Sequence, residues 1–153
     1  MRTNFRALLL STLFITVPLQ ARKKAIAPPE FAPAPTAAAP MFSPGILSYG
    51  TLYISGQVGA DLKTREVPAD FEAEVKTCLD NIGIVLKAAH MKYADVVSVQ
   101  VYLTDMDLFA RMNAVYATYF QTPRPSRTTV GVTRLALPKA RIEITVTARK
   151  HRS

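Results

Sequence analysis

The sequence predicts one small α/β domain with the element order ββαβαββ. Its length of 153 residues suits a single hydrophobic core. Several short segments alternate apolar and polar residues, as half-buried strands do, and two longer ones repeat apolar residues at helical spacing. The composition, 49% hydrophobic and 20% charged, is typical of a globular protein.

The first half of the domain is predicted to be a strand pair followed by a helix. Residues 51–57 are a predicted strand, and residues 45–48 are its expected antiparallel partner across a turn. Asp70 is the expected N-cap of the helix, whose first turn is acidic and whose end is basic, as the helix dipole favours. Its apolar face carries Val75, Leu79, Ile82, Leu86 and Ala89.

The second half contains a strand, a helix and two more strands. Residues 96–103 carry valine or leucine at alternate positions, which predicts a strand. A helix is expected to open at Asp105 or Asp107 and to run to about Phe120, before two prolines end it. Alternation predicts the last two strands at residues 127–132 and 142–148.

Both helices are expected on one face of one sheet, because strand–helix–strand units cross over with a fixed hand. The other face is too polar for a core and too rich in strand residues to be merely solvated. We therefore expect other subunits to cover it, in a homo-oligomer with sites where chains meet. The residues assigned to this mixed face are Gln100, Tyr102, Arg127, Thr129, Glu143 and Thr145.

The N-terminal residues differ from the domain. Two arginines, an apolar run at residues 7–19 and then Ala21 are typical of a secretory signal over residues 1–21. The run is shorter than the about 20 residues that span a bilayer, so no stable membrane span is expected. Basic residues at 22–24 oppose export. A periplasmic or secreted location is expected, with an organellar or cytoplasmic one as the alternative; mass mapping of the mature N-terminus would decide.

Residues 22–40, rich in alanine and proline, are expected to be an extended tether without chemistry of its own, ahead of a folded domain at residues 41–150. The formal charge of +8 belongs to the termini, because residues 42–148 carry 11 basic against 10 acidic residues. A nearly neutral domain is a poor candidate for nucleic-acid binding.

Arg127 and Glu143 are the main candidates for chemistry. A guanidinium fork beside a carboxylate suits an anionic substrate next to an activated water. From spacing alone, a structural ion pair at a subunit interface is favoured. Ser55 and Gly56 either bring backbone N–H groups close to a ligand or form a plain turn, and Asn113 is either a buried amide or a ligand contact.

Other residues are assigned to structure. The single cysteine, Cys78, lies on the apolar stripe of the first helix and is expected to be a core thiol. Two isolated histidines offer no metal-ligand spacing, so no metal site is expected.

Five short motifs follow one another between about Met41 and Arg149: Ser55-Gly56-Gln57, Glu66-Val67-Pro68-Ala69-Asp70, Asn113-Ala114-Val115-Tyr116, Pro125-Ser126-Arg127-Thr128 and Ile142-Glu143-Ile144. Together they resemble the RidA family of reactive intermediate deaminases. The resemblance implies a chorismate-mutase-like fold and a homotrimer with three inter-subunit clefts and no cofactor. It also implies hydrolysis of 2-imino acids, such as 2-iminopropionate and its enamine tautomer 2-aminoacrylate, to 2-keto acids and ammonia.

Carried onto this chain, the resemblance implies that Arg127 holds the substrate carboxylate bidentately and that Glu143 positions the attacking water. The backbone of Thr129 and Gly56 and the side chain of Asn113 would shape the pocket. Ser55 and Phe42 are further expected substrate contacts.

This chain departs from many deaminating members in having Phe42 in place of a tyrosine and Thr129 in place of a cysteine. Two other functions stay open. A non-catalytic trimer would bind a small carboxylate in the same cleft, and a ribonuclease would want a basic patch that the domain lacks.

Overall fold

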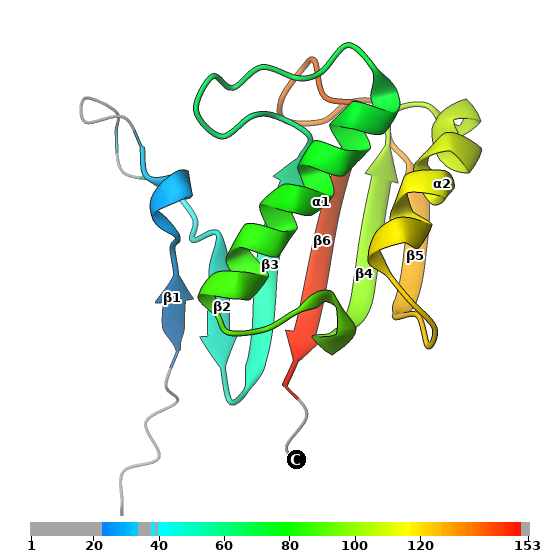
Figure 1. Cartoon of the computed structure of the whole chain (residues 1–153). Helices are drawn as coiled ribbons and strands as arrows, with labels where there is room; N and C mark the ends of the chain where they lie inside the picture. Colours follow the sequence, from blue (N-terminus) through cyan, green and yellow to red (C-terminus); the bar gives the residue numbers. More distant parts are fainter. Residues whose placement is uncertain (1–22, 34–37, 39, 151–153) are drawn as a thin grey trace, which may run out of the picture.

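The computed structural model describes residues 23–33, 38 and 40–150, and it contains a six-stranded sheet in the order β1-β2-β3-β6-β4-β5 (Figure 1). Neighbouring strands are antiparallel except β4 and β5, which are parallel. The strands are β1 (Lys24–Ile26), β2 (Gly45–Ser48), β3 (Thr51–Val58), β4 (Val96–Leu103), β5 (Ser126–Gly131) and β6 (Ile142–Arg149).

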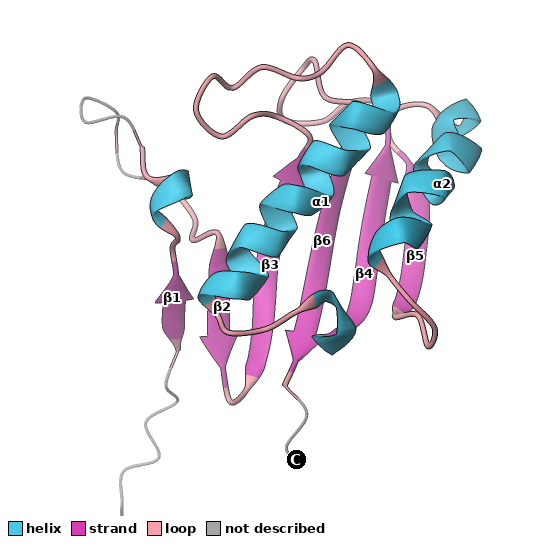
Figure 2. Ribbon diagram, in the orientation of Figure 1, coloured by secondary structure: helices cyan, strands magenta, loops and turns pink. Residues whose placement is uncertain are grey.

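Two helices, α1 (Phe71–Ala88) and α2 (Phe109–Tyr119), cover the same face of the sheet (Figure 2). Single 3-10 turns lie at η1 (Pro29–Phe31), η2 (Tyr93–Asp95) and η3 (Met106–Leu108). The α/β class is therefore confirmed, with both helices on one side of a mixed sheet.

Helix α1 begins and packs as its sequence predicts. The Asp70 carboxylate accepts a hydrogen bond of 2.8 Å from the N–H of Ala73, which satisfies one of the free donors of the first turn. The apolar stripe faces the sheet, where Val75, Leu79 and Ile82 are fully buried. This stripe and the inward side chains of β3, β4 and β6 form the core.

Helix α2 packs beside α1 over the β4 and β5 half of the sheet (Figure 1). The helix proper begins after η3, two to four residues later than either predicted start. Its buried residues are Met112 and Tyr116, and the Tyr116 ring stacks on Phe120 at a centroid distance of 4.3 Å. The hydroxyl of Tyr119 donates to the Asp80 carboxylate of α1 at 2.6 Å, which joins the two helices.

The prediction of a free tether from residue 22 to residue 40 is wrong for its first part. Residues Lys24–Ile26 pair with β2 as an antiparallel edge strand, and the Ile26 side chain is buried in the core. Phe31 also packs against the core. The prediction failed because three residues between prolines and basic residues carry too little alternation to indicate a strand. The expected signal at residues 1–21 lies outside the described residues and stays a prediction.

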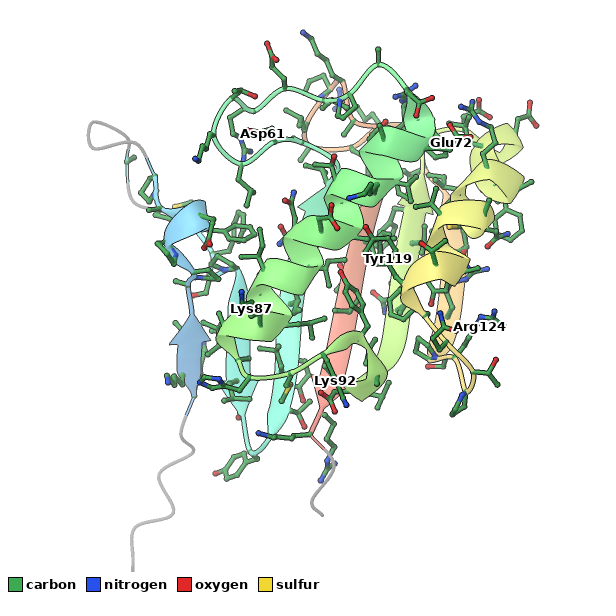
Figure 3. All side chains as sticks on the ribbon, viewed as in Figure 1. Asp61, Glu72, Lys87, Lys92, Tyr119 and Arg124 are labelled. Atoms are coloured by element: carbon green, nitrogen blue, oxygen red, sulfur yellow. The ribbon has the colours of Figure 1, made fainter. Side chains whose placement is uncertain are left out.

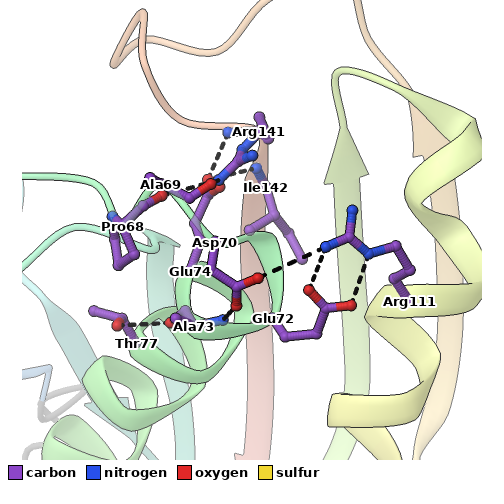
Figure 4. A network of polar contacts seen from close by, with 10 residues as sticks. All are labelled: Pro68, Ala69, Asp70, Glu72, Ala73, Glu74, Thr77, Arg111, Arg141 and Ile142. Carbon is purple, nitrogen blue, oxygen red and sulfur yellow. Dashed lines mark hydrogen bonds and ion pairs between the residues drawn. The ribbon is translucent and has the colours of Figure 1, made fainter.

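A buried ion pair fixes the start of β6. The Glu74 carboxylate of α1 is fully buried and accepts from the backbone N–H groups of Arg141 and Ile142, at 2.6 and 3.3 Å. It also accepts from Arg141 Nε at 2.6 Å, while Arg141 Nη2 donates to the carbonyl groups of Pro68 and Ala69 (Figure 4). These contacts hold three separate segments together next to Glu143.

Candidate functional site

Arg127 lies on the edge strand β5 and is held between two aromatic rings of α2. Its guanidinium carbon is 4.6 Å from the centroid of the Tyr116 ring and 5.7 Å from that of Phe109. A guanidinium at these distances is attracted by the ring quadrupole. Among the described residues, no side chain or backbone group forms a hydrogen bond or an ion pair with this guanidinium. Its five donors are therefore available to a ligand.

The expectation that Arg127 and Thr129 share the mixed face with Glu143 is wrong. In the parallel register of β4 and β5, Arg127 lies across from Val99 and Thr129 from Val101. Both valines are buried under the helices, so these two residues of β5 point to the helix side. Of the residues expected on the mixed face, the paired positions Gln100, Tyr102, Glu143 and Thr145 do lie on the opposite side.

Two hydroxyl groups and an amide lie on the helix side of the sheet, as Arg127 does. The Tyr116 hydroxyl and Thr129 Oγ1 are buried and have no hydrogen-bond partner among the described residues. Burial raises the pKa of Tyr116, although the charges of Arg127 and Arg124 act in the opposite direction. Asn113 is half-buried and lies four residues after Phe109 and three before Tyr116, on the same side of α2. We call Phe109, Asn113, Tyr116, Arg127 and Thr129 the arginine cluster.

Glu143 lies on the other face of the sheet, opposite an irregularity in β3. The register between β3 and β6 shifts between Ile54 and Gln57, and Gly56 falls in this bulge. A Cβ atom at residue 56 would be 2.8 Å from Glu143 Cδ and closer still to Oε1. Only glycine therefore leaves room for this carboxylate. No described residue donates a hydrogen bond to it.

Glu143, Gly56, Ser55 and Phe42 line a cavity of about 470 Å³ at the end of β3. The Ser55 hydroxyl is already engaged, because it donates to the carbonyl of Ser43 at 2.8 Å. Phe42 is 64% exposed at the cavity rim. The sequence-predicted site residues therefore fall into two groups: the arginine cluster on the helix side, and the residues around Glu143 on the other.

Cys78 is a core thiol, as expected. It is fully buried, and its S–H donates to the carbonyl of Gln57 at 3.0 Å. Burial raises the pKa of this thiol far above its usual range. Cys78 therefore has no part in nucleophilic chemistry.

Phe109, Tyr116 and Phe31 belong to the site but were not assigned to it from the sequence. Tyr116 was quoted only as part of a motif, and its role under Arg127 depends on the register of β5. A signal was available, because Tyr116 is seven residues after Phe109 and so lies on the same side of α2. Phe31, which lines the Glu143 cavity, had no such signal.

Residues 23–33, 38 and 40–150 contain neither a metal-ligand group nor a membrane-spanning helix. No three His, Cys, Asp or Glu side chains in this part of the chain lie together as a metal site. None of the helices described there has the length and apolar character needed to span a bilayer.

Comparison with known proteins places the chain in a family. The sequence model of the Endoribonuclease L-PSP family matches residues 31–150. The solved structure of RidA from an Antarctic Psychrobacter species superposes with a TM-score of 0.73 at 33% identity, covering 83% of this chain and 100% of that one. The chain belongs to the RidA family.

Two curated relatives of this RidA-family chain cover more than two thirds of it. A RutC family protein of Sulfurisphaera tokodaii is 43% identical over 71% of this chain and 87% of its own length. A bovine protein named 2-iminobutanoate/2-iminopropanoate deaminase is 43% identical over 74% of this chain and 82% of its own. At this level of identity the names support an imine deaminase role for the family.

Proposed function

We propose that this chain hydrolyses reactive 2-imino acids and their enamine tautomers to 2-keto acids and ammonia. The names of the mammalian relatives support the reaction class. The observation that carries the proposal is the pair of unpartnered charges: a guanidinium fork held on aromatic rings, and a carboxylate in a cavity. The first suits the substrate carboxylate, and the second suits a water molecule.

The two charged groups of one chain cannot act on one small substrate. They point to opposite faces of the sheet, and β4 lies between β5 and β6, which separates the two strands by about 10 Å. We therefore propose a homotrimer in which the arginine cluster of one chain meets the Glu143 cavity of the next. Each site would then need two chains.

The proposed reaction needs only a cation that binds the substrate carboxylate and a carboxylate that activates water. Arg127 fixes the substrate through its carboxylate, and Glu143 takes a proton from the attacking water as oxygen bonds to C2. The electron pair of the C=N bond moves to nitrogen, which takes the proton from Glu143. The C–N bond then breaks as the remaining hydroxyl proton passes to nitrogen, so that ammonia leaves and the keto group forms. No step requires an oxidant or a reductant.

The test uses the full chain, with imino acids generated freshly in solution and the release of keto acid or ammonia as the readout. We expect Arg127→Ala to lower kcat/KM at least about 100-fold, because a charge-assisted bidentate contact is lost. Glu143→Ala should lower kcat by a similar factor. Lys87→Ala is the control, since Lys87 is an exposed cation at the end of α1 (Figure 3) and lies outside the arginine cluster; it should keep full activity.

The alternative is a trimer that binds a small carboxylate without turnover. It predicts no acceleration on any imino acid, together with keto-acid binding that Arg127→Ala abolishes. Those two results together would show that the chain is a binding protein and not a hydrolase.

A further inference from the structure

The cavity beside Glu143 is larger than the smallest imino acids require. Its volume of about 470 Å³ lies in the range of pockets that enclose whole drug-sized ligands. The side chain of 2-iminopropionate is a single methyl group. The single chain therefore offers room for a larger substrate side chain beside the reacting atoms.

Apolar side chains from separate segments line much of this cavity, together with the exposed side chain of Arg65. Phe31 is supplied by η1, Leu62 by the loop between β3 and α1, and Leu137 by the loop between β5 and β6. Phe42 adds a ring without a hydroxyl. Burial of these side chains against an apolar ligand is favourable in proportion to the area removed from water.

The polar groups of the lining are mostly engaged by the protein itself. Asn81 Nδ2 donates to the carbonyls of Val58 and Ala60 at 3.2 and 3.0 Å, and Gln57 Nε2 donates to the carbonyl of Ser55 at 2.9 Å. Groups that are already paired gain little from a polar substrate side chain. Two charged side chains of the lining, Glu143 and the exposed Arg65, have no described partner, and Glu143 lies at the reacting end.

We propose that this cavity selects 2-imino acids with bulky apolar side chains, branched or aromatic, over 2-iminopropionate. The proposal rests on the function proposed above and names its substrate class. Phe31 and Leu137 are the specificity-determining residues. Each methylene buried against them adds about a fourfold gain in kcat/KM.

The experiment compares imino acids made in place from alanine, leucine and phenylalanine by an amino-acid oxidase. We expect the full chain to hydrolyse the leucine and phenylalanine products with kcat/KM at least tenfold above the alanine product. Phe31→Ala and Leu137→Ala should each lower the values for the two bulky substrates about five- to tenfold and leave the alanine product within twofold. Met41→Ala is the control, because Met41 is 98% exposed and does not line the cavity.

Preference for the alanine product would overturn the proposal. If both variants lowered kcat/KM by the same factor on all substrates, the proposal would also be overturned, because a general structural defect lowers activity equally on every substrate. If no imino acid is turned over, the proposed hydrolase function is rejected. The selectivity of the cavity is then measured as keto-acid binding by calorimetry. Tighter binding of 4-methyl-2-oxopentanoate than of pyruvate, reduced in Leu137→Ala, would support the selection of bulky side chains; equal or weaker binding would reject it.

Discussion

Gly56 is the residue on which the position of the Glu143 carboxylate depends. The bulge in β3 brings its Cα so close to this carboxylate that an added methyl group would overlap it. We expect Gly56→Ala to displace Glu143 and to lower kcat for imino acids at least tenfold, as measured by steady-state kinetics.

Gly50→Ala is the matched control for this substitution. Gly50 lies in the turn between β2 and β3 at φ +77°, and an added Cβ there would meet nothing within 4 Å. That variant should lose about 1 kcal/mol of the free energy of unfolding and keep its activity. Full activity in Gly56→Ala would contradict the role given to Glu143.

At the residue scale, the sequence predicted which side chains matter better than it predicted where they point. Arg127 and Glu143 were both selected, but Arg127 was assigned to the wrong face. Strand β5 carries Val130 on the open side, where it is 41% exposed, so its apolar residues did not mark the core. The pairing register with β4 decides which face of the sheet the side chains of β5 point to. The alternation of residues within one strand does not reveal that register.

At the element scale, the contacts of Glu74 place β6. This carboxylate is fully buried and binds two consecutive backbone N–H groups together with Arg141 Nε. A buried carboxylate is tolerated only when its partners satisfy it, and its removal leaves the partners unpaired. The residue directly after this pair of N–H groups is Glu143.

We expect Glu74→Ala to lower the free energy of unfolding by about 3 kcal/mol, as measured by urea denaturation. Glu74→Gln keeps an oxygen acceptor for the N–H groups and should lose less. If both variants are as stable as the natural chain, the contacts at the start of β6 do not contribute to folding.

Elements with local signals were predicted closely. Asp70 was recognised as the cap of α1, and the bounds of β4 agree with the prediction. Val97 was expected on the apolar side of β4 but is 45% exposed, because the register shifts there and Val96 is buried instead. Strand β1 was not predicted, because its three residues form a strand only through pairing with β2 and burial of Ile26. Such long-range contacts carry no local sequence pattern.

At the scale of the whole molecule, the separation of Arg127 from Glu143 has a direct test. Chains carrying Arg127→Ala and chains carrying Glu143→Ala are each expected to be inactive. Mixed trimers would contain one site in which both natural residues meet. With random mixing we expect roughly a quarter of the natural activity after the two chains are produced together.

The control replaces the second partner by the double variant Arg127→Ala/Glu143→Ala, which can form no intact site and should restore nothing. Failure of the first mixture to regain activity, with trimers shown by mass, would place both groups in one chain. The open face of the sheet would then need another explanation.

Strand β1 also sets a limit on how far the chain can be shortened. It pairs with β2 from Lys24, so cleavage after Ala21 would leave the sheet complete. A chain that begins after Ile26 would expose the backbone of β2, and an uncovered strand edge is a template for aggregation. The same cut would open the core beside Gly45, whose neighbours include Ile26 and Leu52. The first residues of the domain therefore protect its solubility as well as its fold.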